Sequence, residues 1–321
     1  MKLHENKLLF ADAVRATSEL MNMAPEFAEK DYWICQILQN LSRHPDASRI
    51  VWKGGTSLSK AYKLVGRFSS DVDFAILAEG LSQNQLKKLV THIGKDTTAD
   101  LTEQDIEGNT IKNSRYRKTY HLYDSVIPQR NSRYQFLGNH VIVEINTYGN
   151  PYPYVTKPVC TFISDMMRQQ GRENLISEMD MEPFTLNVLD KRRTLCEKVA
   201  SLLRFSFEDD AIKGLSSKIR HFYDLHYLSQ DSECIEYLQT EFPQHLTDLI
   251  VHDKQEFDRP LLWKNADLRT SILFTDFDAL WQKISPVYQT EVSALSFGDI
   301  PDKGIIAKST KALLERIRQI I

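Results

Sequence analysis

The sequence predicts an α/β domain followed by a helical domain. Short runs of β-branched and aromatic residues alternate with amphipathic segments in the first half, as in residues 50–77 and 140–148. From about Leu189 the apolar residues recur at helical spacing almost to the end of the chain. We therefore expect an α/β domain with a small mixed sheet over residues 1–188 and a helical domain over residues 189–321.

The composition is that of an ordinary globular protein. The 321 residues are 42% hydrophobic and 26% charged, with a formal net charge of −3 and a mean hydropathy of −0.38. These values exclude a disordered chain and give no overall attraction to nucleic acid. The four cysteines show no metal-ligand spacing, and no apolar run approaches the ~18 residues of a membrane span. We expect a cytoplasmic protein with reduced thiols.

The first half of the chain predicts helices and strands in alternation. Two helices open the fold, over residues 7–23 and 26–42. "RIVWKGG" predicts a strand halted by glycine, and "TSLSKAYKLV", residues 56–65, predicts a helix after a tight turn. Further strands are predicted at 71–77, 117–126 and 140–148, and a further helix at 81–93.

The second half is predicted to be helical. The proline- and tyrosine-rich segment 150–158 predicts an irregular crossing before it. The clearest helical periods lie at 192–205, 216–229, 278–285 and 309–321. The last of these segments is amphipathic, which predicts that it packs into a core, with docking on the first domain or on a partner as the alternative.

The stretch "KGGTSLSK" places two of the twelve glycines side by side. Without a Cβ, Gly54 and Gly55 let the backbone approach a ligand, and the helix that follows presents unpaired N–H groups. Thr56 or Ser57 can cap the helix or donate a hydroxyl to phosphate. The turn therefore predicts a phosphate-binding loop, with an ordinary strand-to-helix turn as the alternative. The P-loop and dinucleotide-binding fingerprints are absent.

Two aspartates follow at positions i and i+2 of "DVDFAIL". Strand geometry puts Asp71 and Asp73 on one face, about 6.5 to 7 Å apart, and turns their apolar neighbours to the core. Such a pair suits Mg²⁺, which binds few protein carboxylates together with substrate phosphates. Glu144 in "HVIVEINTY" offers a third acid, costly in so apolar a strand unless paired or metal-bound. Solvated strand faces are the alternative.

These segments together resemble a known family. "KGGTSLSKAYKLVGRFSSDVDF", with "EKDYWICQIL" upstream and "RRTLCEKVASL" and "IRHFYDLHYL" downstream, is similar to the AbiEii/AbiGii toxin nucleotidyltransferases, which include the MenT toxins. The resemblance runs from about residue 29 to 228 and implies a polymerase-β-like nucleotidyltransferase fold. Fifteen residues separate Gly55 from Asp71, a longer spacing than in the wider superfamily.

The resemblance implies a nucleotide and metal site in the first domain. It assigns the nucleoside triphosphate to Gly54, Gly55 and Thr56 or Ser57, and it places Ser69 at the active site. It assigns Mg²⁺, with Mn²⁺ as an alternative ion, to Asp71 and Asp73, and Glu144 is expected to ligate one ion or to deprotonate the acceptor. Lys53 and Lys60 flank the glycine turn and can steer phosphate, with a surface role as the alternative.

The resemblance also implies two site residues in the helical domain. Lys198 is expected to contact phosphate, and Asp224 is expected to complete the active-site cleft. Simpler explanations exist for both. Lys198 flanks an apolar helical stripe, as solvated lysines do, and Asp224 stands four residues after Arg220, the spacing of an ordinary helical ion pair.

The segment 112–133 predicts a local basic patch. It contains six basic residues against one acid: Lys112, Arg115, Arg117, Lys118, Arg130 and Arg133. Tyr116, Tyr120 and Tyr123 are interleaved with them and can stack on exposed bases. The patch predicts binding of an RNA acceptor, with a solvated hairpin as the alternative.

The expected reaction is attack of an acceptor hydroxyl on the α-phosphorus of a nucleoside triphosphate, with release of pyrophosphate. The resemblance implies tRNA as acceptor, growth arrest as the consequence and restraint by a cognate antitoxin of a toxin-antitoxin or abortive-infection system. Three alternatives stay open: nucleotide transfer to a protein, phosphodiester hydrolysis by a metal-dependent nuclease, and nucleotide binding without turnover. Nothing in the sequence identifies the base or the acceptor.

Overall fold

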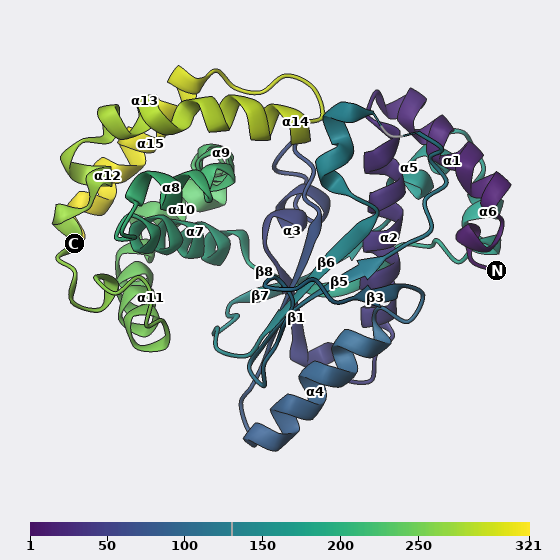
Figure 1. Cartoon of the computed structure of the whole chain (residues 1–321), viewed down its shortest axis with the longest axis horizontal. Helices are drawn as coiled ribbons and strands as arrows, with labels where there is room; N and C mark the ends of the chain where they lie inside the picture. Colours follow the sequence, from purple (N-terminus) through teal and green to yellow (C-terminus); the bar gives the residue numbers. More distant parts are fainter. Residues whose placement is uncertain (130) are drawn as a thin grey trace. The chain divides into compact units, whose positions relative to one another are not determined.

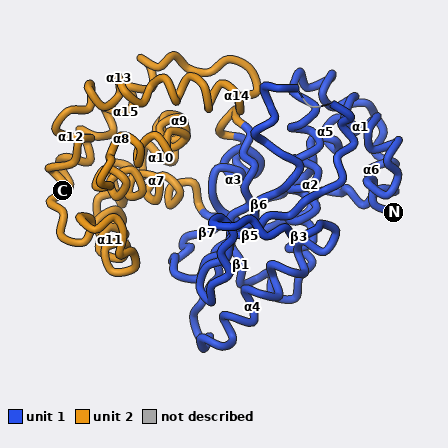
Figure 2. Tube along the Cα trace, viewed as in Figure 1, with its two compact units in different colours: residues 1–63, 68–189 blue, residues 64–67, 190–321 orange. Residues whose placement is uncertain are grey.

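A computed structural model of the protein describes residues 1–129 and 131–321 (Figure 1). The chain divides into two compact units, one of residues 1–63 and 68–189 and the other of residues 64–67 and 190–321 (Figure 2). We call the first the α/β unit and the second the helical unit. The short segment 64–67 belongs to the helical unit although it lies within the first quarter of the chain.

The α/β unit begins with the two predicted helices. Helix α1 spans Lys7–Met21 and α2 spans Pro25–Ser42. The side chain of Asn6 caps α1 by accepting a hydrogen bond from the Leu9 N–H at 3.1 Å. Helix α2 starts with proline at its first position and is buried along most of its length. Both predictions of helix are confirmed.

Among the described residues, eight strands form one mixed sheet in the order β3-β5-β6-β2-β1-β8-β7, with β4 beside β5. Their bounds are β1 Ile50–Lys53, β2 Asp71–Ile76, β3 Thr102–Gln104, β4 Ile111–Lys112, β5 Tyr116–Leu122, β6 His140–Asn146, β7 Tyr154–Val159 and β8 Phe184–Leu189. The pairs β1–β8 and β2–β6 are parallel and the others are antiparallel. The prediction of a mixed sheet is confirmed.

Strand alternation separates a core face of the sheet from a polar face. Val72, Phe74, Val143 and Ile145 are at most 1% exposed, as the period of two predicted. Helix α4, Gln83–Asp96, covers this face, and a Cβ added to its Gly94 would lie 3.5 Å from Ile145 Cδ1. The carboxylates of β2 consequently stand on the opposite face.

Several segments differ from the prediction. The segment expected to be irregular contains β7, whose Pro158 is tolerated because β7 is the edge strand of the sheet. Helix α3 spans only Gly55–Lys60, and Lys63 adopts a positive φ of 52° soon after it ends. Helices α5, Phe162–Gln169, and α6, Glu173–Glu178, were not predicted.

The helical unit confirms the four predicted helical segments. Its helices are α7 Lys191–Phe205, α8 Ala211–Ser216, α9 Ile219–Leu228, α10 Ser232–Gln239, α11 Phe242–Glu256, α12 Ile272–Thr275, α13 Phe277–Val287, α14 Ser293–Leu295 and α15 Lys303–Arg318. Short helical turns across the two units are η1 Leu3–Glu5, η2 Ala47–Arg49, η3 Ser132–Leu137, η4 Trp263–Asn265, η5 Leu268–Thr270 and η6 Tyr288–Val292. Helix α15 buries Ile306, Leu313 and Ile317, so the amphipathic final segment does pack into a core.

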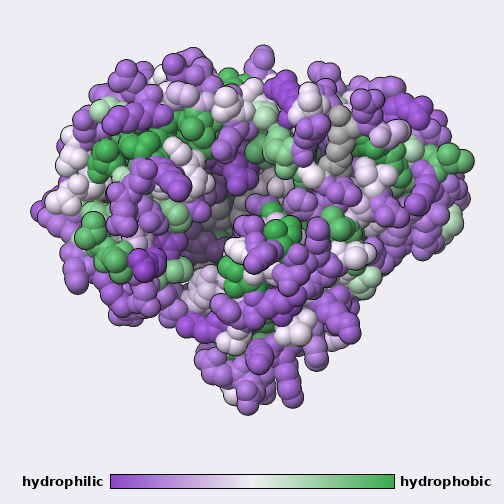
Figure 3. All heavy atoms as spheres, in the orientation of Figure 1, coloured by the Kyte–Doolittle hydropathy of each residue, from purple (hydrophilic) through white to green (hydrophobic). Residues whose placement is uncertain are grey.

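The surface and the cysteines agree with the composition. The face in Figure 3 is mostly hydrophilic, with apolar residues in separate groups. In the part of the chain that the structure describes, no helix combines the length and the apolar character needed to cross a membrane. The thiols of Cys35, Cys160, Cys196 and Cys234 are free.

Candidate active site

Four charged residues form a row across the polar face of the sheet. Lys53 of β1 lies opposite Asp73 of β2, and Asp73 lies opposite Glu144 of β6. Glu144 in turn lies opposite Lys118 of β5. Residues in register on neighbouring strands share a face and lie about 5 Å apart. We call these four residues the charged row; its two central acids are flanked by a lysine on each side.

The glycine turn touches the charged row at Asp73. Gly54 ends β1, adopts a φ of +87° and is the N-cap of α3. A Cβ built on Gly54 would lie 2.1 Å from Asp73 Oδ2. Both the backbone angle and the neighbouring carboxylate therefore require glycine at position 54. Gly55 is the first residue of α3.

The hydroxyl groups of the turn bind backbone carbonyl groups. Thr56 Oγ1 donates to the Asp71 carbonyl, and Ser57 Oγ donates to the Gly54 carbonyl at 2.8 Å. Both residues are buried inside α3. The prediction that one of them caps the helix is wrong, because the helix begins one residue earlier than expected. The Thr56 hydrogen bond instead joins the turn to the start of β2, and the Ser57 hydrogen bond closes the turn on Gly54.

The serine that contacts Asp71 is Ser70. Ser70 Oγ donates to Asp71 Oδ1 at 3.1 Å. Ser69, the serine singled out in the sequence, is in the same segment and is 6% exposed. A serine next to an acid carries no periodic signal, so sequence reasoning did not single out Ser70.

Glu144 is held by two side chains of β5. Lys118 Nζ lies 2.9 Å from Glu144 Oε1, and the Tyr116 hydroxyl donates to Glu144 Oε2 at 2.7 Å. Burial by itself would lower the pKa of Lys118, but the hydrogen bond and charge of Glu144 outweigh it and raise that pKa. Burial, followed by the charge of Glu144, raises the pKa of Tyr116. The acid in the apolar strand is therefore paired.

The basic patch is divided between the two faces of the sheet. Lys118 belongs to the charged row, whereas Arg117 faces α4, with its Nε 3.6 Å from a Cβ built on Gly94. Lys112 pairs with Glu103 at 2.6 Å. Arg130 lies outside the described residues. The predicted patch is thus less continuous than the sequence suggests.

The aromatic residues of the patch do not form the predicted stacking surface. Tyr120 and Tyr123 are only 8% and 4% exposed, and Tyr123 stacks on Trp33 with ring centroids 5.5 Å apart. The exposed arginines contact other tyrosines. The Arg115 guanidinium lies 5.8 Å from the Tyr148 ring centroid, and that of Arg133 lies 5.7 Å from the Tyr134 centroid.

Lys60 is buried, whereas its position beside the glycine turn suggested contact with phosphate or exposure at the surface. Its side chain is 5% exposed and forms an ion pair with Asp31, which is 1% exposed. The Lys60 ammonium also lies 4.4 Å from the Phe162 ring centroid. Its charge is therefore satisfied within the α/β unit, and the expectation of a surface lysine is wrong.

Lys198 and Asp224 lie in the helical unit and contact each other. Lys198 Nζ is 2.8 Å from Asp224 Oδ2, and both side chains are buried. Arg67 donates to the same carboxylate from Nε at 2.7 Å and from Nη2 at 2.6 Å. Burial favours a higher pKa of Asp224, but the charges of Arg67 and Lys198 outweigh it and lower that pKa.

These contacts correct the simpler explanations drawn from the sequence. Lys198 is not a solvated flank residue, because it is only 6% exposed. Asp224 pairs with Arg67 and Lys198, where the helical spacing had suggested Arg220. Arg67 was missed because 157 residues separate it from its partner.

The donor groups of β2 fit a hard divalent cation. Asp71 and Asp73 are half-buried on one face and offer carboxylate oxygens, which Mg²⁺ prefers as ligands. No three acidic, cysteine or histidine side chains converge as a metal site within residues 1–129 and 131–321. Substrate phosphates and water would therefore have to supply further ligands, as is usual for Mg²⁺ in phosphate-binding enzymes.

Comparisons with known proteins identify the family. The profile described as "Nucleotidyl transferase AbiEii toxin, Type IV TA system" matches residues 36–301. The fold is similar to that of MenT4, a nucleotidyltransferase toxin from Mycobacterium tuberculosis, with a TM-score of 0.56 and 15% identity over 98% of this chain and 93% of that chain. No curated protein matches by sequence. The chain belongs to the AbiEii family and is a nucleotidyltransferase toxin of a type IV toxin-antitoxin system.

Proposed function

We propose that this toxin transfers a nucleoside monophosphate from a nucleoside triphosphate to an RNA acceptor, with tRNA as the acceptor class. The reaction depends on Mg²⁺, takes place in the cytoplasm and is restrained by a cognate antitoxin. The observation that carries the proposal is the charged row, in which Asp73 lies against the Gly54 turn and beside Glu144.

Asp71 and Asp73 hold the metal in this proposal. They project from one strand on one face, and Ser70 orients the Asp71 carboxylate. The chemistry that Mg²⁺ would supply when held by these acids is neutralisation of charge on the phosphates and a lower pKa of an attacking hydroxyl. The N–H groups of the Gly54 and Gly55 turn approach the phosphates because no Cβ obstructs them.

The lysines of the charged row provide positive charge on either side of the two acids. Lys53 flanks Asp73 on β1, and Lys118 flanks Glu144 on β5. Fixed cations beside the reacting phosphates stabilise the charge that develops during transfer. Glu144 keeps Lys118 in place through the 2.9 Å ion pair.

The proposed RNA acceptor rests on the resemblance to the AbiEii/AbiGii toxins and on the exposed cations of the segment 112–133. Arg115 and Arg133 are exposed and each lies against a tyrosine ring. Cationic side chains of this kind contact phosphates without reading sequence. Their number is small, so a structured acceptor that presents a 3′ hydroxyl fits better than a long single strand.

The test is incubation of the purified protein with Mg²⁺, each α-labelled nucleoside triphosphate in turn and total cellular RNA. Asp71→Asn and Asp73→Asn are the test variants, and Asp105→Asn, which changes an exposed acid on the same unit, is the control. We expect label in a tRNA-sized band with the wild type and the control only. Label in protein, shortened RNA without label, or nucleotide binding without transfer would each contradict the RNA acceptor.

The same assay assigns the role of Glu144. If Glu144 ligates a metal, Glu144→Gln raises the Mg²⁺ concentration needed for half-maximal transfer. If Glu144 takes the acceptor proton, the variant leaves that concentration unchanged and removes the acidic limb of the pH-rate profile.

A further inference from the structure

Arg67 lies at the centre of a buried group of charges in the helical unit. Arg67 is 2% exposed, Asp224 is 0% exposed and Lys198 is 6% exposed. Arg67 binds both oxygens of Asp224, at 2.7 and 2.6 Å, and Lys198 binds one of them at 2.8 Å. Two-point binding of a carboxylate by arginine fixes both the distance and the orientation of the pair. We call these three residues the Arg67 cluster.

The backbone around Arg67 is fixed as well. The Gly66 carbonyl accepts hydrogen bonds from the Phe297 N–H at 2.9 Å and from Ser296 Oγ at 3.2 Å. Arg67 and Ser296 also form an isolated antiparallel bridge. The segment 64–67 is thereby tied to the helical unit by its backbone and by its side chain.

The next residue along the chain is fixed in the other unit. Phe68 is 3% exposed and stacks on Phe27 of α2, with ring centroids 4.8 Å apart and planes 17° apart. Consecutive Cα atoms across a trans peptide are about 3.8 Å apart. The chain therefore passes from the helical unit at Arg67 to the α/β unit at Phe68 within one peptide bond.

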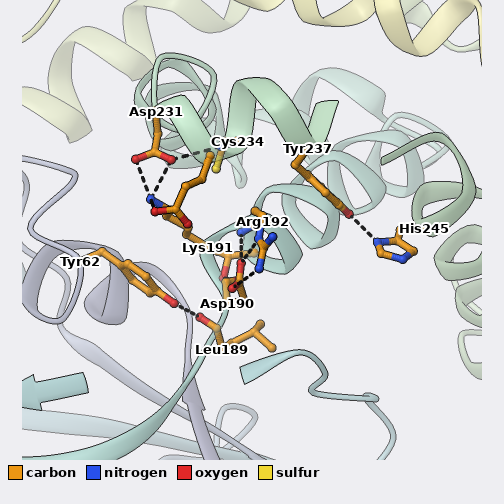
Figure 4. A network of polar contacts seen from close by, with 11 residues as sticks. Tyr62, Leu189, Asp190, Lys191, Arg192, Asp231, Cys234, Tyr237 and His245 are labelled. Carbon is orange, nitrogen blue, oxygen red and sulfur yellow. Dashed lines mark hydrogen bonds and ion pairs between the residues drawn. The ribbon is translucent and has the colours of Figure 1, made fainter. Parts of the chain in front are cut away.

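The later crossing is built in the same way (Figure 4). The Leu189 carbonyl accepts a hydrogen bond from the Tyr62 hydroxyl at 2.9 Å, and both residues belong to the α/β unit. The next residue, Asp190, belongs to the helical unit, where it caps α7 by accepting from the Arg192 N–H at 2.8 Å. Each crossing thus joins two residues that are fixed in their own units.

Arg67 stands directly upstream of the acids of the candidate active site. Only residues 68–70 separate it from Asp71. Ser70 contacts the Asp71 carboxylate, and Thr56 binds the Asp71 carbonyl. A displacement that begins at residue 67 therefore reaches the first acid of β2 through a short segment that is fixed at both ends.

We infer that Arg67 is a positioning residue for nucleotide transfer: held by Asp224 and Lys198, it fixes the end of the segment that carries Asp71 and Asp73 into the sheet. The inference rests on the proposed role of these two acids. It assigns Lys198 and Asp224 an action through Arg67, in contrast to the direct phosphate contact that the family resemblance implies for Lys198.

Hydrogen exchange tests the structural part without any substrate. We would compare wild type, Arg67→Met, Asp224→Asn and the double variant by mass spectrometry of peptides that cover residues 61–76. The control is Leu246→Ala, which leaves a cavity at a fully buried position of α11. We expect exchange at residues 64–76 to become at least ~10-fold faster in the cluster variants and to stay at the wild-type rate in the control.

Kinetics test the positioning part. In the labelling assay, Arg67→Met is expected to raise the Mg²⁺ concentration for half-maximal transfer and to lower kcat by ~100-fold, as displaced catalytic groups do. Arg67→Lys, which keeps the positive charge but offers one donor nitrogen in place of two, is expected to recover part of the loss. The kcat of the Arg67→Met, Asp224→Asn double variant is expected to be no lower than that of the slower single variant. The effects of two residues that act as one unit do not add.

Two results would overturn the inference. One is unchanged exchange at residues 64–76 in Arg67→Met and Asp224→Asn. The other is faster exchange with wild-type Mg²⁺ dependence and wild-type kcat, which would leave the Arg67 cluster with a structural role alone. If the wild type labels no RNA, the proposed acceptor fails, and the exchange experiment still decides whether Arg67 fixes the segment.

Discussion

The carboxylate of Asp73 lies against the backbone of Gly54, so close that a Cβ on Gly54 would be 2.1 Å from Asp73 Oδ2. The two residues are 19 positions apart, and the antiparallel pairing of β1 with β2 brings them together. A glycine that sequence alone explains as a turn residue is required by a specific neighbour. The phosphate-binding loop and the metal-binding acid of the proposed site are therefore parts of one packing arrangement.

Gly54→Ala is expected to abolish most nucleotide transfer. The Cβ must displace the Asp73 carboxylate, and a displacement of about 1 Å at a catalytic group lowers a rate by ~100-fold. The backbone of Gly54, with φ +87° and ψ −169°, lies in a region that is essentially restricted to glycine, which adds about 1–3 kcal/mol of strain for a residue with a Cβ. Labelling of RNA and thermal unfolding measure the two effects.

Gly80→Ala is the matched control for that variant. Gly80 also has a positive φ, +75°, but a Cβ there meets nothing within 4 Å. We expect Gly80→Ala to lose similar stability and to keep its transfer activity. Equal losses of activity in the two variants would show that backbone strain, and not the contact with Asp73, accounts for the effect.

Lys118→Met is expected to lower transfer by ~10- to 100-fold, because it removes a fixed cation from the charged row and releases Glu144. The loss of stability should be small, about 1 kcal/mol, since both side chains are partly exposed, at 29% and 24%. Lys112→Met is the control, because its 2.6 Å pair with Glu103 joins β4 and β3, which both pair with β5, and lies outside the charged row. Equal activity of the two variants would remove Lys118 from the site.

Lys60→Met is expected to destabilise the α/β unit by about 3–5 kcal/mol, because it leaves the buried Asp31 without its cation. Burial raises the pKa of Asp31 even with Lys60 present. The double variant Lys60→Met with Asp31→Asn keeps an acceptor for the Phe162 N–H, which binds Asp31 at 2.7 Å. We expect the double variant to recover at least half of the free energy of unfolding that Lys60→Met loses, as measured by urea unfolding. A double variant less stable than the single one would contradict a dominant charge effect.

The stability of the protein is expected to fall between pH 6.5 and pH 4 because of His121. Burial lowers the pKa of His121 to about 4 from its ordinary value of 6.5. Between these values the unfolded state binds a proton that the folded state does not, so the free energy of unfolding decreases as the pH falls through this window. The contribution is full above pH 6.5 and amounts to about 3 kcal/mol.

His121→Gln should reduce the slope of the unfolding free energy against pH over that window. Part of the slope should remain, because burial also lowers the pKa values of His4, His221 and His226. His92→Gln changes a histidine that is exposed on α4 and should leave the slope as it is in the wild type. Urea titrations at several pH values between 7.5 and 4 make the comparison. A slope that is the same in all three proteins would show that another group titrates in this range.

Local pattern determined much of the fold. The alternation of "DVDFAIL" and "HVIVEINTY" placed Val72, Phe74, Val143 and Ile145 in the core, and helical spacing located α1, α2, α7 and α15. Strand β7 was missed because the prolines and tyrosines of the segment 150–158 give no periodic signal, and only its pairing with β8 makes it a strand. Helix α3 ended early because Lys63 adopts a left-handed backbone, which no pattern of apolar residues records.

The sequence by itself determined the residue types of the candidate site and the faces on which they stand. Paired glycines, two acids at a spacing of two and one acid in an apolar strand are local features, and backbone geometry fixes their orientation. Only the tertiary structure decided their partners. The charged row depends on the register of four strands, and the pair of Arg67 with Asp224 joins residues 157 positions apart. Neither contact leaves a trace in local spacing, because the packing of distant segments creates both.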